Sequence, residues 1–509
     1  MLRQRFTFTT SLGVAVCGAA LLAQQSPSTP VPAEQRDRGS ATVHLLADIN
    51  PTGSSGATGF TAFGRFVYFA ADDGTHGAEL WRTDGTREGT TLVRDINPGA
   101  GHAAPLEITI YRGRMFFAAT SADFGRELWS SDGTEAGTTL VHDINPGPAD
   151  SQPALFTEFR GALFFRAQDA AGLELWRTGG TAESTERVAD LHPGEQGSVP
   201  TYPTVFRNAL FFSADDLYTP GIGFDRELWR TDGTGRGTVR VRDINPGPAP
   251  SIPGELTRLG RYLVFKAGDP ELGGELWRTD GTEAGTVPVA DMNPGPASSF
   301  PTNLVRVGRT IFFAADDGRT GRELWRTDGT TEGTALVADI NPGGESSGPE
   351  GIPFRNGYLF IAGDAAHGRE LWFSDGTTAG TRLVRDINPG PEGSGPIGFV
   401  AAGSMAFFSI IRQSAAGDGT VHTELWRTDG TEAGTQRVWE APGRSSGYSI
   451  EGLTRIGPLL FFTAPTRVDA EGMSTDFEPH VLFLGGLLFD DLLDSASSDG
   501  QATGAASMR

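Results

Sequence analysis

Adjacent acidic residues are the feature of this sequence that most directly suggests chemistry. Three pairs recur at similar places along the chain: Asp72 and Asp73, Asp215 and Asp216, and Asp316 and Asp317. Calcium takes roughly 6 to 8 oxygen ligands, so such pairs could contribute to a calcium site. Neighbouring residues of an extended chain point to opposite sides, however, and other copies of the segment keep one aspartate, as at Asp269 and Asp364. We therefore assign no metal ligands, and calcium is the one cofactor that these residues allow.

Signals for nucleophilic or zinc chemistry are weak. The segments 344–348 and 443–447 match the pattern Gly-x-Ser-x-Gly, but a nucleophile elbow needs a strand before the serine and a helix after it. Both segments lie at equivalent places between two strand candidates, which indicates repeated loops. The eight histidines are scattered, without a His-Glu-x-x-His motif or a Cys/His cluster. We name no catalytic residue and leave the question of an enzyme open, leaning against catalysis.

These residues are positioned by a repeated segment, Arg-Glu-Leu-Trp-Arg-Thr-Asp-Gly-Thr-x-x-Gly-Thr, which is clearest at 322–334. A regular period makes each copy one supersecondary unit. The segment resembles the ELWxxDGT repeat family of bacterial secreted proteins, which is named for its motif and not for an activity. Its tryptophan returns every 47 to 54 residues, at Trp81, Trp129, Trp176, Trp229, Trp277, Trp325, Trp372 and Trp426.

Each repeat unit contains four short strand candidates separated by turn residues. In the unit 255–295 the candidates are 256–259, 262–267, 275–278 and 287–292. Glycine, aspartate or Asn-Pro-Gly separates them, as expected for tight turns. Helical repeats are excluded because Gly or Pro interrupts every apolar run and no run has helical spacing. Four strands in about 48 residues are typical of one propeller blade.

The number of units follows from the apolar run of the second strand. The last unit has a weak third strand near 480–483 and no fourth strand, and the segment 42–50 can supply it, which would leave no open sheet edge. The sequence thus predicts an all-β fold, a β-propeller of nine four-stranded blades of about 48 residues closed by the N-terminal strand. Eight blades is the alternative. The nine runs are 66–70, 115–119, 163–167, 210–214, 262–267, 310–315, 358–362, 405–409 and 459–464.

Segments outside the repeats suggest export. Residues 1–23 combine Arg3 and Arg5 with a short apolar run and small residues, which is typical of a signal peptide. We expect a flexible linker at 24–41, the propeller at 42–486 and a disordered acidic tail at 487–509. The only cysteine is Cys17, so no disulfide framework is expected. The protein should be periplasmic, on the cell surface or secreted, and no later segment is apolar enough to span a membrane.

The net charge of -22 excludes nucleic acid as a partner, because phosphate backbones need a basic surface. We expect a monomer. The repeat family and the repeated nature of the polar residues predict a non-catalytic binding or surface-interaction scaffold with a glycan or a protein as ligand. The alternatives are a carbohydrate-active enzyme on a propeller platform and a structural component of the envelope or matrix.

The eight tryptophans share one strand position, which favours a structural repeat core packed between blades over a sugar-stacking array. The Thr-Asp-Gly-Thr turn is structural too, because glycine supplies positive φ and aspartate accepts backbone N–H groups. It resembles the Asp-box of sialidase-type propellers, which is itself a turn. The third unit has Thr178-Gly179-Gly180-Thr181 and loses this aspartate.

Loops after the second and fourth strands of a meander share one side of the ring, and all length variation falls there, at 215–225, 411–423 and 466–476. We expect any ligand to bind on this side, at a rim formed by the two long loops of the last two units with Tyr218 opposite. The candidate residues are Asp72, Asp73, Asp215, Asp216, Tyr218, Asp316, Asp317, Arg412, Asp418, Asp469 and Glu471.

Overall fold

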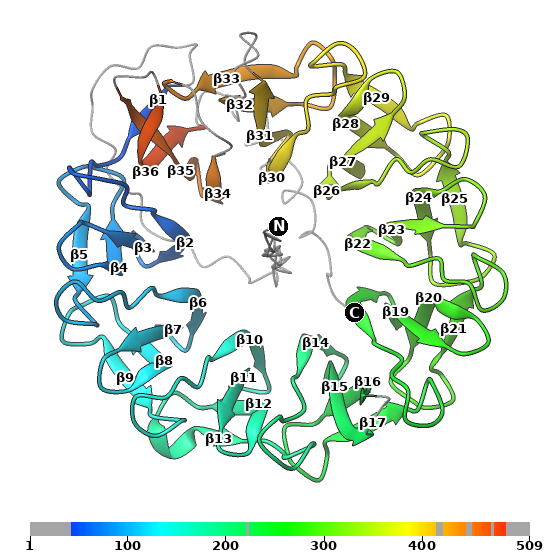
Figure 1. Cartoon of the computed structure of the whole chain (residues 1–509), viewed down its shortest axis with the longest axis horizontal. Coiled ribbons are helices and arrows are strands. Elements are labelled where there is room, and N and C mark those ends of the chain that lie inside the picture. Colours follow the sequence, from blue (N-terminus) through cyan, green and yellow to red (C-terminus); the bar gives the residue numbers. More distant parts are fainter. Residues whose placement is uncertain (1–41, 220–222, 414–420, 444–449, 470–472, 485–509) are drawn as a thin grey trace, which may run out of the picture. The chain divides into compact units, whose positions relative to one another are not determined.

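The computed structural model describes residues 42–219, 223–413, 421–443, 450–469 and 473–484. In this part of the chain, strands β1 to β36 form nine four-stranded antiparallel sheets. The sheets follow one another around a ring, as the blades of a propeller do (Figure 1). The predicted nine-bladed fold is confirmed, and the eight-bladed alternative is wrong.

The four strands of each blade run from the centre of the ring outward (Figure 1). The innermost strands are β2 (Thr58–Phe63), β6 (Leu106–Tyr111), β10 (Ala154–Phe159), β14 (Thr201–Phe206), β18 (Gly254–Leu259), β22 (Thr302–Val307), β26 (Glu350–Phe354), β30 (Ile397–Ala402) and β34 (Glu451–Ile456). The second strands are β3 (Phe66–Asp72), β7 (Arg114–Ser121), β11 (Ala162–Asp169), β15 (Ala209–Thr219), β19 (Tyr262–Asp269), β23 (Thr310–Asp316), β27 (Gly357–Asp364), β31 (Met405–Gln413) and β35 (Leu459–Val468).

The third strands carry the Glu-Leu-Trp motif in the first eight blades. They are β4 (Ala78–Thr83), β8 (Gly125–Ser131), β12 (Gly172–Thr178), β16 (Gly223–Thr231), β20 (Gly273–Thr279), β24 (Arg322–Thr327), β28 (Gly368–Ser374), β32 (Val421–Thr428) and β36 (Ser474–Phe483). The outer strands are β5 (Thr91–Arg94), β9 (Thr139–His142), β13 (Glu186–Arg187), β17 (Val239–Arg242), β21 (Val287–Ala290), β25 (Ala335–Ala338), β29 (Arg382–Arg385), β33 (Gln436–Glu440) and β1 (Val43–Leu45). Blade 1 starts at β2, and blade 9 consists of β34, β35, β36 and β1.

The first half of the second strand is a continuous apolar run, because neighbouring blades cover both of its faces there. In β19 the side chains of Leu263, Val264 and Phe265 are all 0% exposed. The tryptophans of the third strands pack against the preceding blade, as Trp129 does against Tyr68 and Val93. Six of the eight are buried, and Trp81 and Trp372 are partly buried. The hydrophobic core is therefore a series of interfaces between successive blades.

The turn between the third and fourth strands explains why Asp and Gly recur there. In blade 4 the Asp232 carboxylate accepts the Thr234 amide (2.9 Å), and a Cβ at Gly237 would overlap that carboxylate. Blade 3 has Gly179 in place of the aspartate and Ser184 in place of the second glycine. The Ser184 hydroxyl takes over the role of the carboxylate by accepting the amides of Gly179 (3.1 Å) and Thr181 (3.0 Å). Ser184 ends η1 (Ala182–Ser184), which is the only helical element among the described residues.

The N-terminal strand closes the ring. β1 pairs with β36 in antiparallel register, Val43 opposite Leu482, and completes the ninth sheet. The strand is shorter than the predicted 42–50. Beyond Leu45, the Leu46 amide still donates to the Pro479 carbonyl (2.9 Å), and the Ile49 amide donates to the Glu478 carboxylate (2.9 Å). Within the described part of the chain, no helix has the length and apolar character needed to cross a membrane.

Candidate functional site

A buried glutamate occupies the same register of the third strand in every blade. In blade 4, Glu227 accepts the Ile244 amide (3.0 Å), the Ser251 amide (3.1 Å) and the Ser251 hydroxyl (2.7 Å), so it fastens the loop after the fourth strand to the third strand. Burial raises the pKa of Glu227 to about 7. The nine residues, each 2% exposed or less, are Glu79, Glu127, Glu174, Glu227, Glu275, Glu323, Glu370, Glu424 and Glu478.

The residue two positions before this glutamate separates two kinds of blade. In six blades it is a glycine with positive φ, and a Cβ there would overlap the backbone of the loop after the fourth strand. In blades 4, 8 and 9 the hairpin between the second and third strands is longer, and the position carries Asp225, His422 or Asp476. The six glycines are Gly77, Gly125, Gly172, Gly273, Gly321 and Gly368. Polar side chains thus enter this register only in the blades with long hairpins.

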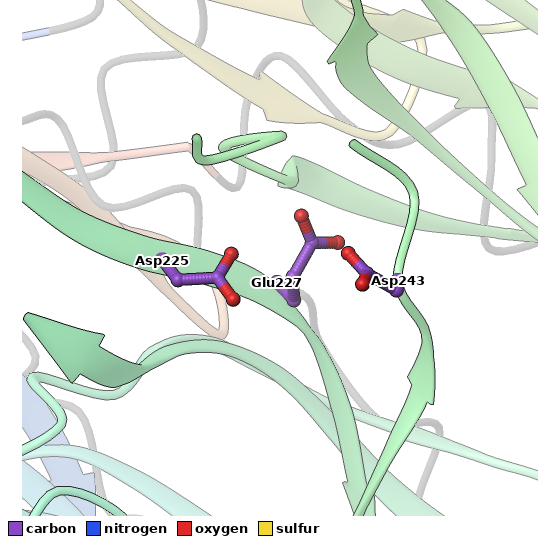
Figure 2. A group of neighbouring side chains, drawn as sticks. All are labelled: Asp225, Glu227 and Asp243. Carbon is purple, nitrogen blue, oxygen red and sulfur yellow. The ribbon is translucent and has the colours of Figure 1, made fainter. Parts of the chain in front are cut away.

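In blade 4 the additional side chain completes a group of carboxylates. Asp225 and Glu227 extend from β16, and Asp243 follows β17, with one oxygen of each lying within 4.8 Å of the others (Figure 2). Asp225 is 2% exposed, and its Oδ1 has no hydrogen-bond partner in the part of the chain that the structure describes. Asp216 also has a buried Oδ1 without a partner there. The free Oδ1 of Asp243 is less distinctive, because Asp48, Asp95, Asp143 and Asp386 share this feature at the same repeat position.

One guanidinium faces this group. Arg240 Nη1 lies 3.0 Å from Asp225 Oδ2 and 3.8 Å from both Asp216 Oδ2 and Asp243 Oδ1. Burial and then the charge of Asp216 raise the pKa of Asp225 to about 6, although Arg240 opposes the shift. Arg240 pairs with Trp229 across the sheet, a register that holds leucine in four other blades: Leu92, Leu140, Leu336 and Leu383. Blades 3 and 8 also have arginine at this register, Arg187 and Arg437, so the arginine is shared by three blades and is not a general feature of the repeat.

Blade 8 has different side chains at the same five registers. Asp216 corresponds to Arg412, Asp225 to His422, Glu227 to Glu424, Arg240 to Arg437 and Asp243 to Glu440. With Trp426, these five blade 8 residues line a cavity of about 400 Å³. That volume lies in the range of pockets for small molecules.

Within the described residues, Glu424 does not accept the amide that its counterparts accept. The Ala441 amide, which corresponds to the Ile244 amide, donates to the Thr423 carbonyl (2.9 Å) and not to a glutamate. Glu424 instead accepts the indole N–H of Trp426 (2.7 Å) and lies 2.9 Å from Arg437 Nη1. Burial would raise the pKa of Glu424, but the bonds from Trp426 and Arg437 and the charge of Arg412 lower it. The carboxylate is therefore ionised and faces the cavity.

The acidic pairs of blades 1 and 6 form local turns. Asp73 accepts the amides of Thr75 and His76 (both 2.8 Å), and Asp317 accepts those of Arg319 (2.9 Å) and Thr320 (2.8 Å). Their neighbours Asp72 and Asp316 accept the amides of Gly74 and Gly318 (both 2.7 Å). These carboxylates are already satisfied and have no geometry for a shared ion.

The remaining candidates of the predicted rim are divided among three blades. Asp215 pairs with Arg226 (2.8 Å) beside the blade 4 group, and Asp469 accepts the Met473 amide (2.8 Å) in the blade 9 hairpin. The backbone of Tyr218 pairs with Phe224 in the blade 4 hairpin. Asp418 and Glu471 lie outside the described residues. The third strand of blade 9 contacts the loop after the fourth strand of blade 8, since the Ser474 hydroxyl donates to the Pro442 carbonyl (2.5 Å).

Sequence reasoning missed the residues that matter most in both blades, Asp225, Arg240, His422 and Arg437. A signal was present, because aligning the nine units places Asp225 and His422 where most units have glycine, and Arg240 and Arg437 where four have leucine.

No protein-family model matches the chain, and no curated protein matches it. Solved structures do match. They include one from a study of two prolyl endopeptidases (TM-score 0.40, 11% identity, 75% of this chain and 55% of that chain) and puromycin hydrolase (0.36, 12%, 75% and 62%). A third is prolyl oligopeptidase B from Galerina marginata (0.38, 10%, 74% and 55%). The chain spans 55% to 62% of the length of these proteins.

The non-catalytic binding scaffold expected from the sequence is not supported. The proteins matched are named as peptidases and a hydrolase, and the described residues give no positive sign of a non-catalytic scaffold for a glycan or a protein. The alternatives of a carbohydrate-active enzyme and a structural component gain no support either. At such identities and TM-scores the likeness is one of fold, so the activities of the matched proteins are not transferred to this chain.

Proposed function

We propose that the protein binds a divalent cation, calcium, at the carboxylates of blade 4. The observation that supports this most strongly is Asp225, which is 2% exposed and has an Oδ1 without a hydrogen-bond partner among the described residues. A buried carboxylate oxygen in that state costs free energy unless a cation or a donor meets it. The ligand candidates are Asp216, Asp225, Glu227 and Asp243, all of which offer the oxygen atoms that calcium prefers.

The charge balance of the group favours a second cation beside Arg240. Four carboxylates surround one guanidinium, and only Asp225 lies within hydrogen-bond distance of Arg240. Without another cation, the repulsion is relieved by protonation, consistent with the raised pKa values of Asp225 and Glu227. A calcium ion would instead keep the carboxylates ionised. It would also connect the long hairpin of blade 4 to the loop after its outer strand.

Titration calorimetry of metal-free protein with calcium chloride tests the proposal. We expect one site per chain with a dissociation constant of about 10⁻⁴–10⁻³ M, as for weak extracellular calcium modules. Asp225→Asn removes one charged ligand while keeping the shape of the side chain, and it should weaken binding about tenfold or more. Asp317→Asn is the matched control, because Asp317 is 8% exposed and engaged in its own turn. Unchanged calcium affinity in Asp225→Asn would rule the site out.

A further inference from the structure

The cavity of blade 8 is the feature that cation binding leaves unexplained. It measures about 400 Å³ and is lined by Arg412, His422, Glu424, Trp426, Arg437 and Glu440. The side chains of Arg412, His422 and Arg437 are 37%, 34% and 49% exposed, so a molecule entering from solvent can reach them. We propose that this cavity binds a small organic molecule through a carboxylate group.

The hydrogen-bonding capacity of the lining residues indicates an acceptor as ligand. Both oxygens of Glu424 are engaged, Oε1 by Arg437 (2.9 Å) and Oε2 by Trp426 (2.7 Å). Glu440 Oε2 accepts from Arg437 (2.6 Å), and its Oε1 lies 3.4 Å from His422 Nδ1. The acceptors of the cavity are thus committed to groups of the protein.

Donors, by contrast, are in excess. Arg437 uses Nη1 for both of its carboxylate partners, and a guanidinium has five N–H groups. Arg412 Nη2 and Nε each lie 3.4 Å from an oxygen of Glu424, and the buried Nε makes no hydrogen bond within the described residues. Guanidinium groups present two parallel N–H donors that match the two oxygens of a carboxylate. A ligand carboxylate would therefore use donors that the protein leaves free.

The net charge of the cavity favours a carboxylate over a phosphate as the ligand group. The two arginines balance Glu424 and Glu440, so the cavity is close to neutral when His422 is uncharged. A carboxylate, which carries one negative charge per group, fits such a cavity better than a phosphate dianion, whose two charges lie on one group and would both be repelled by the two nearby carboxylates. The fully buried Glu424 has a positioning role, because it holds Arg412 and Arg437 on either side of the cavity.

The comparison with blade 4 shows that these residues are not repeat residues. At the five shared registers, blade 8 has two guanidinium groups and an imidazole where blade 4 has one guanidinium, while two carboxylates replace four. Seven of the repeat tryptophans have an indole N–H without a partner among the described residues, and Trp426 alone of the eight donates to the glutamate of its own strand. Among the described residues, Glu424 thus bonds to side chains of the cavity, and the Ala441 amide donates elsewhere.

Calorimetric titration of the full chain, freed of metal by dialysis, with succinate and glutarate is the test, with succinamide as the uncharged control. We expect saturable binding of at least one dicarboxylate and none of succinamide. Arg437→Leu should weaken binding about tenfold or more, the scale of a lost hydrogen bond to a charged group. Arg240→Leu removes the arginine of the same register in blade 4 and should leave dicarboxylate binding unchanged.

A second variant keeps the test valid if Arg437→Leu fails to fold. Glu440→Gln leaves both arginines in place and removes a carboxylate that competes for Arg437, so dicarboxylate binding should become several-fold tighter. Inorganic phosphate is titrated in parallel. The proposal is overturned if neither dicarboxylate binds at millimolar concentration, if succinamide or phosphate binds more tightly, or if folded Arg437→Leu and Glu440→Gln bind as the parent does.

Discussion

Blade 4 holds four carboxylates around one guanidinium, whereas blade 8 holds two guanidinium groups and an imidazole around two carboxylates, at the same five registers. Both blades have a long hairpin between the second and third strands, and both have a side chain where six blades need glycine. A longer hairpin thus allows a polar side chain two positions before the buried glutamate, while the pairing of the four strands is kept. The opposite side of each blade, with its Thr-Asp-Gly-Thr turn, is the same in both.

The largest expected difference between the two blades concerns their shared glutamate. Glu227→Ala leaves the buried Ile244 amide without its acceptor and leaves the amide and hydroxyl of Ser251 with the Arg226 carbonyl alone, so it should lower the free energy of unfolding by about 2–4 kcal/mol. Glu424→Ala frees arginines that can turn toward water and should cost about 1–2 kcal/mol. Urea denaturation of both variants measures this, and equal losses would show that Glu424 still holds a loop as its counterparts do.

The uniform turn should respond equally in both blades. Gly237→Ser in blade 4 and Gly434→Ser in blade 8 each place a Cβ against an aspartate carboxylate and should cost about 1–3 kcal/mol. Combining Gly237→Ser with Asp232→Gly reproduces the arrangement of blade 3 and should recover most of the loss. Thermal denaturation of the single and double variants checks this. A double variant no more stable than Gly237→Ser alone would show that a serine hydroxyl does not replace the Asp232 carboxylate in this turn.

The arginines should differ in their response to calcium. Arg240→Leu removes the hydrogen-bonded counter-ion of buried Asp225 and should lower stability by about 1–2 kcal/mol in metal-free buffer. Calcium should restore most of that loss, because it neutralises the same carboxylates. Arg437→Leu should show a loss that calcium does not restore. Melting curves of both variants with and without calcium provide the measurement, and the same calcium response in both would remove the distinction between the sites.

The smallest effect concerns pH. In metal-free protein the pKa values of Asp225 and Glu227 are raised, to about 6 and about 7, so the folded state binds more protons than the unfolded state between about pH 4 and 7. Stability should therefore fall as the pH rises through that window. The stabilisation by calcium should change in the opposite sense, being largest above pH 7 and fading toward pH 5 as protons compete for the ligands. A calcium effect that is constant from pH 8 to pH 5 would exclude these carboxylates as ligands.

Much of the fold could be predicted from the sequence because its periodicity is strong. The interval between tryptophans and the Asp-Gly turns predicted a four-stranded blade. The missing last strand predicted that the N-terminal strand closes the ring, and this strand is observed at Val43–Leu45. The ligand-face candidates were less well predicted. Asp73 and Asp317 were selected for their repetition, and their carboxylates turned out to be engaged by amides two and three residues further along the chain.

The strands, the turns and the order of the blades can thus be predicted from the sequence, because each depends on residues within one unit of about 48. The chemistry of blades 4 and 8 depends on side chains that three different strands and a loop bring to one register, such as Asp216, Asp225 and Asp243. Whether such carboxylates share a cation or satisfy separate turns is a matter of distances between atoms far apart in the chain. Those distances arise from the pairing of strands in the sheet and the loop packed against it, and so they appear only in the tertiary structure.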